Sequence, residues 1–192
     1  MLSGQQGQLI SQHLELLLKW NSRVNLTSIT QPEKILTRHF GESLFAAREL
    51  YPKPMGSGSL IDLGSGAGFP GIPIKIWAPE LHVTLIESQQ KKATFLREVT
   101  RALNLTSLDV ANQRAEARGL QADTVTLRAV EKFDSTLPIA ADLVNKGGRL
   151  ALLIGATQVA TATSLLPRFS WNSSIPMPLS ESRVLLIGHS PQ

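Results

Sequence analysis

The 192-residue chain contains no cysteine. This absence excludes disulfide bonds, thiolate metal sites and a cysteine nucleophile, and it agrees with the cytoplasmic location that we expect. We also predict no metal site of any other kind.

Long apolar runs are missing as well. None reaches the roughly 20 residues that cross a bilayer, and residues 1–14 lack the charged and apolar regions of a signal peptide. We therefore predict no contact with a membrane. The hydrophobic fraction of 42% is enough for a sizeable core, and the net charge of +4 suits an anionic partner without requiring one.

The first quarter of the chain has a helical pattern. Apolar residues recur at helical spacing from Leu9 to Leu18, and Thr30, followed by Pro32 and Glu33, is typical of a helix start. The segment YPKPMGSGS then interrupts the pattern with proline, glycine and serine. We predict an N-terminal helical lobe over residues 1–55 and a second domain over residues 56–192.

After residue 56 the pattern alternates between strands and helices. The predicted strands are SLIDL, HVTLIE, SLDVANQ, TVTLRAV, RLALLIG and RVLLIGH. The predicted helices are GIPIKIWA, QQKKATFLREVTRALNL with Ser88 as its N-cap, STLPIAADLVNKGG closed by glycine, and QVATATSLL. Such alternation predicts an α/β fold, with a mostly parallel sheet covered by helices on both faces.

A glycine-rich segment, DLGSGAGFPG, lies between the first strand and the first helix of this domain. Ligands of parallel sheets bind outside the carboxyl ends of the strands, where glycine lets the backbone approach them. Gly66, Gly68 and Gly71 satisfy the dinucleotide pattern G-x-G-x-x-G, but this register begins past the strand end and puts a proline in the phosphate turn. The register Gly64, Gly66, Gly68, preceded by Asp62, is that of methyltransferases that use S-adenosylmethionine.

Glu87 ends the second strand, about 20 residues after the loop, where a carboxylate accepts the ribose hydroxyls of a nucleoside. A solvated acid at a strand end is the alternative. Loop and acid together predict a nucleoside ligand, but they do not separate S-adenosylmethionine from NAD.

Longer segments of the sequence distinguish between S-adenosylmethionine and NAD. They are WNSRVNLTSI, RHFGESL, DLGSGAGFPGIPIKI, VTLIESQQKKATFLREV, QRAE and LRAV, in this order. In them the chain resembles the bacterial small-subunit ribosomal RNA guanine-N7 methyltransferases, the methyltransferase G family, also called glucose-inhibited division protein B. The resemblance implies a Rossmann-like class I methyltransferase fold with an N-terminal helical extension, and S-adenosylmethionine as the cofactor.

The resemblance also implies which residues bind the cofactor. They are Asp62, Gly64, Ser65, Gly66, Gly68, Phe69, Glu87, Ala115, Glu116 and Arg128. Gly64 and Phe69 would contact S-adenosylmethionine directly, Glu87 would take the place of the ribose acid, and Ala115 and Glu116 would lie beside the adenine.

Two positions depart from the family pattern. HFGES contains Gly41 and Glu42 where the family commonly has HxxDS, and Ile154 precedes Gly155 where the family usually has a lysine after the fifth strand. If that lysine helps to hold RNA, its absence bears on the substrate more than on the cofactor.

The implied chemistry needs no general base, because guanine N7 has an in-plane lone pair and loses no proton on methylation. The chain shows no acid–base pair or triad, and the lack of cysteine excludes the covalent route to pyrimidine C5. LRAVEKF also lacks the [DNS]-P-P-[YFW] motif of amine methylation. As the one catalytic residue we predict Arg128, which would orient the guanine; a structural salt bridge is the alternative.

The implied partner is small-subunit ribosomal RNA or the assembling small subunit, bound by a monomer. RNA binding requires cations, and the candidates are Arg38, His39, Lys91, Arg97 and Arg101. Solvated surface charges, or a buried histidine at His39, are the alternatives. Three other functions stay open: a small-molecule methyltransferase of the same fold, an NAD-dependent oxidoreductase, and a non-catalytic RNA-associated module.

Overall fold

The computed structural model describes residues 2–53, 57–113, 119–130 and 132–192. Its helical elements are α1 (Gly4–Asn21), α2 (Pro32–Ile35), the π-helical segment η1 (Leu36–Gly41), α3 (Glu42–Leu50), α4 (Gly71–Trp77), α5 (Gln90–Ala102), α6 (Phe133–Asp142), the 3₁₀ turn η2 (Ala156–Gln158) and α7 (Val159–Leu165). Its strands are β1 (Ser59–Leu63), β2 (His82–Ile86), β3 (Leu108–Ala111), β4 (Ala122–Arg128), β5 (Val144–Gly155), β6 (Ser170–Trp171), β7 (Ile175–Pro176) and β8 (Arg183–His189).

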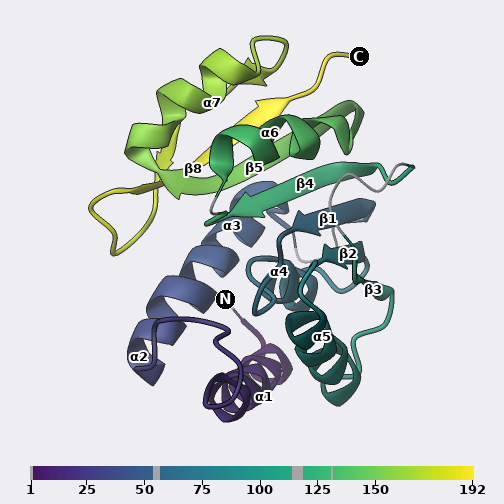
Figure 1. Cartoon of the computed structure of the whole chain (residues 1–192), viewed down its shortest axis with the longest axis vertical. Coiled ribbons are helices and arrows are strands. Elements are labelled where there is room, and N and C mark those ends of the chain that lie inside the picture. Colours follow the sequence, from purple (N-terminus) through teal and green to yellow (C-terminus); the bar gives the residue numbers. More distant parts are fainter. Residues whose placement is uncertain (1, 54–56, 114–118, 131) are drawn as a thin grey trace.

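The strands form one sheet in the order β3-β2-β1-β4-β5-β8-β6, and β7 also pairs with β8 (Figure 1). Strands β1 to β5 are parallel, and β8 is antiparallel to β5. The chain proceeds from β1 outward to β2 and β3, then returns to the other side of β1 with β4. The strand order therefore reverses between β1 and β4, the place where open α/β sheets bind ligands. This topology confirms the predicted mixed, mostly parallel sheet.

Alternating side chains of the central strands belong to two hydrophobic cores, one on each face of the sheet. In β5, Ala151 and Leu153 join one core, and Leu150 and Leu152 join the other. The first core also contains side chains of α1 to α5, while α6 and α7 cover the second. Both faces are therefore covered by helices, as the alternation of apolar strands and helices along the sequence predicts.

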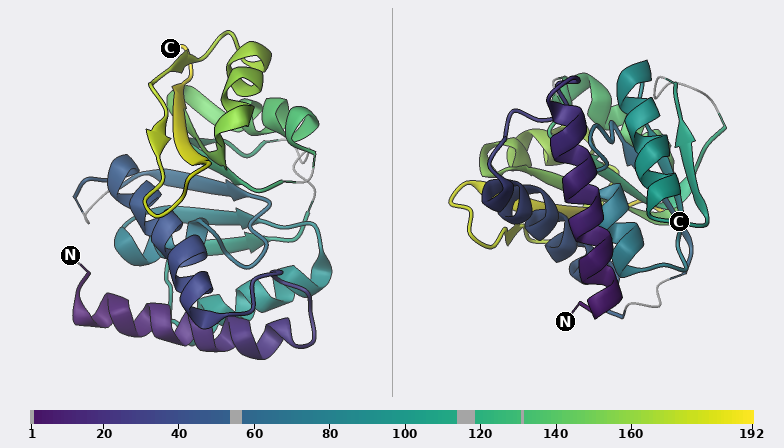
Figure 2. Two further views of the ribbon diagram at one scale, coloured as in Figure 1. Left: turned by 90° about the vertical axis from the view of Figure 1, so that its left-hand side faces the viewer. Right: turned by 90° about the horizontal axis from the view of Figure 1, so that it is seen from below.

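The N-terminal helices lie on the first face. Helix α1 runs across α4 and α5 (Figure 2). A second helical stretch begins at Pro32, as expected from its proline and glutamate, and continues through η1 into α3. Side chains of these helices, among them Leu17 and Phe40, belong to the same core as those of β1 and β2. The predicted domain boundary after residue 55 falls within residues 54–56, which lie outside the described ranges.

Three details differ from the sequence prediction. Gln89, not Ser88, is the N-cap of α5, and its N–H donates to the Glu87 carboxylate at 2.8 Å. Helix α6 ends at Asp142, because the chain after it already pairs with β4 and enters β5 at Val144. The short strands β6 and β7 were not predicted, because two-residue strands carry no alternating pattern.

Candidate functional site

A tight glycine turn leaves the carboxyl end of β1 at the reversal point of the sheet. Gly64, Gly66 and Gly68 have φ values of +72°, +56° and +89°, which residues with a Cβ rarely adopt. The N–H groups of Gly64 and Ser65 donate to the Ile86 carbonyl at 2.9 and 3.1 Å, so the turn is fixed to the end of β2. Each glycine of the register Gly64, Gly66, Gly68 thus has a left-handed backbone conformation, whereas Gly71 of the other register does not.

Two buried side chains at the base of the turn hold its shape. The Asp62 carboxylate accepts the Gly71 N–H at 3.1 Å and the Thr126 hydroxyl at 2.8 Å, and so joins β1, α4 and β4. A Cβ at Gly71 would lie 2.8 Å from Asp62 Oδ2, so glycine is needed for this close approach. The Ser65 hydroxyl donates to the Asp62 carbonyl at 2.8 Å. Asp62 and Ser65 therefore support the turn.

Glu87 lies directly after β2 and faces the same turn. Its side chain is buried, and its two oxygens accept the Gly66 N–H at 3.0 Å and the Gln89 N–H at 2.8 Å. Each carboxylate oxygen can accept more than one hydrogen bond, so both retain capacity for ligand hydroxyls. The residues present thus fit a nucleoside, because a carboxylate is fixed at one side of a glycine-rich turn.

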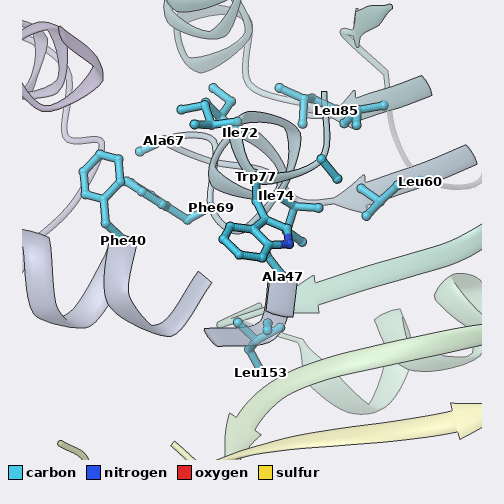
Figure 3. Packing of buried hydrophobic residues seen from close by; sticks show 14 of the residues in the cluster. Phe40, Ala47, Leu60, Ala67, Phe69, Ile72, Ile74, Trp77, Leu85 and Leu153 are labelled. Carbon is cyan, nitrogen blue, oxygen red and sulfur yellow. The ribbon is translucent and has the colours of Figure 1, made fainter. Parts of the chain in front are cut away.

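Phe69, at the far end of the turn, stacks on two histidines. The His13 and His39 rings stack on Phe69 with centroid distances of 5.1 and 4.9 Å, and Phe40 meets its edge at 4.9 Å. Figure 3 shows Phe40 and Phe69 side by side, with Ala67 of the turn close to them. Phe69 therefore anchors the turn in the first core, and its ring is occupied by packing.

His13 also holds the turn directly. Its Nε2 lies 3.0 Å from the Ala67 carbonyl, which can only accept, so Nε2 carries the hydrogen. His13 is fully buried, and its Nδ1 has no hydrogen-bond partner in the described part of the chain. Helix α1 thereby fixes one carbonyl of the candidate cofactor loop.

We expect His13 to position the loop for its ligand. His13→Phe keeps an aromatic ring but removes the donor to Ala67, whereas His13→Gln keeps an amide donor. The expected dissociation constant for S-adenosylhomocysteine rises about tenfold in the Phe variant, since one hydrogen bond to the loop is lost. The Gln variant regains part of this affinity. Equal affinities of the Phe variant and the unmodified protein, measured by calorimetry, would contradict the role.

Both histidines are neutral near pH 7. Burial lowers the pKa of His13 to about 4, and burial together with the charges of Arg128 and Arg38 lowers the pKa of His39 to about 3. The Arg128 Nη2 group donates to His39 Nδ1 at 3.0 Å, which leaves the hydrogen on Nε2 to face the Thr27 hydroxyl at 2.8 Å. His39 is therefore a satisfied buried histidine, while its role in RNA binding stays a prediction.

These shifts predict how stability depends on pH. Below pH 6.5 the unfolded chain protonates both histidines and the folded chain does not. Each histidine therefore lowers the free energy of unfolding by about 1.4 kcal/mol for every unit by which the pH falls. Burial raises the pKa of Asp62 from 3.8 to about 6, which acts in the opposite direction between those values. Between pH 6 and 4 the two histidines are opposed by Asp62, so the net slope of the free energy of unfolding against pH is about that of a single histidine. His13→Phe should nearly abolish this slope. Urea unfolding at pH 4, 5 and 6 measures this; equal slopes for both proteins would contradict it.

A charged cluster lies where η1 and α3 meet the ends of β4 and β5. We call it the arginine cluster: Arg38, Arg128 and Arg183 around Glu42. Arg128 Nη2 donates to Glu42 Oε2 at 3.2 Å and to the Arg38 carbonyl at 2.9 Å. Arg183 Nε also donates to Glu42 Oε2, at 3.0 Å. Arg38 Nε is 3.1 Å from Glu42 Oε1, but both atoms lack an aligned hydrogen bond among the described residues, so this contact is an ion pair only.

The remaining predicted residues are placed as follows. Arg128 ends β4 and makes the salt bridge that was the alternative interpretation of it, while its role toward a substrate stays a prediction. Lys91, Arg97 and Arg101 are exposed along α5, and the last two line a groove of about 390 Å³ beside β3. Ala115 and Glu116 lie outside the described residues.

Sequence reasoning missed the roles of three residues. His13 belongs to an ordinary amphipathic pattern, Glu42 was noted only as a departure, and Arg183 stands at the start of a predicted strand. Arg183 is the register partner of Gly155, so it brings a cation to the end of β5, where the chain has buried Ile154 instead of the expected lysine. The sequence does signal Glu42 and Arg38, four positions apart on one helix, as a pair.

The described ranges contain no group of three or more His, Cys, Asp or Glu side chains that could hold a metal ion. None of the helices in them combines the length and apolar character needed to span a bilayer.

The strand order, the glycine turn after β1 and the acid after β2 define a class I S-adenosylmethionine-dependent methyltransferase fold. Magnesium protoporphyrin IX methyltransferase from Synechocystis PCC 6803, solved with bound S-adenosylmethionine, superimposes with a TM-score of 0.72 at 14% identity, covering 93% of this chain and 97% of that chain. A methyltransferase from Pyrococcus furiosus superimposes with a TM-score of 0.64 at 15% identity, covering 95% and 99%. At these identities the likeness establishes the fold alone.

The chain belongs to the rRNA small subunit methyltransferase G family, whose model matches residues 6–176. Ribosomal RNA small subunit methyltransferase G of Roseiflexus castenholzii is 48% identical over 139 residues, 69% of this chain and 58% of that protein. The protein of the same name from Roseiflexus sp. is 40% identical over 184 residues, 89% of this chain and 77% of that protein. The alignments thus span between 58% and 77% of these two relatives. The family expected from the sequence is confirmed.

Proposed function

We propose that this chain transfers the methyl group of S-adenosylmethionine to N7 of a guanine in small-subunit ribosomal RNA. The observation that carries the proposal is the pairing of the glycine turn with Glu87, whose Oε2 accepts the Gly66 N–H at 3.0 Å. This pairing lies at the reversal point of the sheet, in a chain that belongs to the rRNA small subunit methyltransferase G family.

Glu87 and the glycine turn would hold the cofactor, Glu87 by its sugar and the turn by contacts with its own main chain. Glu87 would accept the ribose hydroxyls, while Gly64 and Gly66 let the nucleoside approach the main chain. When bound, S-adenosylmethionine supplies an electrophilic methyl group on a sulfonium sulfur. Asp62, Ser65 and His13 would keep the turn in its binding shape, because their hydrogen bonds fix its base and its Ala67 carbonyl.

The acceptor nitrogen would be aligned without a base. Asp62 is occupied by two donors inside the sheet, and His39 is neutral with both ring nitrogens engaged. Neither is placed to remove a proton, which agrees with N7 chemistry, where none is removed. Arg128 is the candidate to orient the guanine from the end of β4, and Glu42 holds its side chain in place.

The test is incubation of the protein with labelled S-adenosylmethionine and small ribosomal subunits that lack the modification. We expect one labelled guanine, methylated at N7, when the RNA is mapped by cleavage at 7-methylguanine. Binding of the cofactor without transfer to subunits or free RNA would overturn catalysis and favour an RNA-associated module. We further propose that the protein acts as a monomer in the cytoplasm, with the RNA or the assembling subunit as its partner.

A further inference from the structure

The arginine cluster carries more positive charge than it neutralises. Three guanidinium groups share the single carboxylate of Glu42, which leaves an excess of two positive charges among these four side chains. Glu42 is 1% exposed, Arg128 10% and Arg183 17%, so bulk water screens these three charges much less than that of Arg38, which is 42% exposed. Burying unpaired charge is costly, and an anion bound at the cluster would offset that cost.

The cluster also has unused donors. Arg128 Nε is buried and has no hydrogen-bond partner in the described chain. Arg183 uses Nε on Glu42 and Nη2 on the Leu153 carbonyl at 3.0 Å, and no hydrogen bond of its Nη1 is found among the described residues. Arg38 is 42% exposed and makes no aligned hydrogen bond through Nε. Planar guanidinium groups with free N–H donors are well suited to phosphate oxygens.

The position of the cluster ties it to the candidate cofactor site. Arg128 ends β4, the strand that pairs with β1, and Val130 just beyond it lies close to Gly64 of the turn. Arg183 starts β8 opposite Gly155, at the carboxyl end of β5. Figure 1 shows α3 beside the arrowhead of β4, the end of the strand at which Arg128 meets Glu42. A phosphate held here would lie next to a base presented to the glycine turn.

We propose that Arg183, together with Arg38 and Arg128, forms a binding site for a backbone phosphate of the RNA substrate, and that Glu42 holds the three guanidinium groups in position. This inference rests on the proposed function, since it names how that site grips its RNA. It assigns a binding role to Arg183 and a positioning role to Glu42.

The test compares Arg183→Gln, Arg183→Lys and Arg38→Gln with the unmodified protein. Arg168→Gln is the matched control, because it removes one positive charge from an exposed pair with Asp142 on the opposite face of the sheet. Binding of unmodified small-subunit RNA is measured with S-adenosylhomocysteine present, over a series of salt concentrations. Methyl transfer and S-adenosylhomocysteine affinity are measured in parallel, and thermal unfolding checks that each variant is folded.

We expect Arg183→Gln to weaken RNA binding about tenfold or more and to reduce the slope of log affinity against log salt by roughly 0.7 to 0.9, as for one lost phosphate contact. S-adenosylhomocysteine affinity stays unchanged. Arg183→Lys retains the salt slope but loses part of the affinity, and Arg38→Gln behaves like Arg183→Gln. The Arg168 variant matches the unmodified protein.

Two results separate this inference from the proposed function. If Arg183→Gln and Arg38→Gln bind RNA as tightly as the control, the phosphate site is overturned even when methyl transfer is normal. If RNA binding depends on Arg183 but no methyl group is transferred by any of the proteins, the site stands and the proposed catalysis fails. Equal losses of RNA and S-adenosylhomocysteine affinity would show a structural role and overturn the inference.

Discussion

Replacement of Glu87 by alanine is expected to raise the dissociation constant for S-adenosylhomocysteine about 100-fold. The substitution removes the carboxylate proposed for the ribose, and each hydrogen bond to a charged group contributes roughly 1.5 to 3 kcal/mol. It also leaves the N–H groups of Gly66 and Gln89 without their acceptor, so the turn and the start of α5 lose a common support.

Two companion variants make this measurement specific. Glu80→Ala removes an exposed acid from the α4–β2 connection and should bind the ligand normally. Glu87→Gln keeps one acceptor oxygen but cannot accept both N–H groups, so its affinity should lie between those of Glu87→Ala and the unmodified protein. Titration calorimetry measures all of them. A change of less than twofold in Glu87→Ala would remove Glu87 from the cofactor site.

The sequence predicted the parts of this site that lie close together along the chain. The strand SLIDL, the glycine turn, the helix after it and the acid ending the next strand all follow local rules of spacing and turn chemistry. The order in which these elements appear also determines that the turn and Glu87 meet, because parallel neighbouring strands end at the same edge. The β1–α4–β2 unit is therefore predictable from the amino-acid sequence alone.

The supports of the site are not predictable in this way, because they join residues far apart in the chain. His13 reaches Ala67 across 54 positions, and Arg183 reaches Glu42 across 141. Nothing in a helical pattern distinguishes a histidine that packs on a loop from one that faces solvent. Phe69 shows the same limit: the resemblance placed it beside the cofactor, and only the fold reveals that two histidine rings stack on it.

The expected cost of Glu42→Ala is about 3 to 5 kcal/mol in the free energy of unfolding, the range found when one partner of a buried ion pair is removed. Three guanidinium groups would then face one another without a carboxylate. Arg128 Nη2 would keep only the Arg38 carbonyl and His39 Nδ1 as acceptors. In urea unfolding the midpoint should fall while the slope m is unchanged, since the same surface is exposed on unfolding.

Two comparisons test whether charge or packing causes this loss. Glu42→Asp keeps the carboxylate, one methylene shorter, and should cost clearly less than Glu42→Ala. Asp142→Ala breaks the exposed pair with Arg168, which lies 2.7 Å away, and should cost at most about 1 kcal/mol. If Glu42→Ala were no more costly than Asp142→Ala, the three arginines would not depend on Glu42 for their placement. The excess charge would then be balanced by solvent, and the reason to expect an anion at the cluster would be gone.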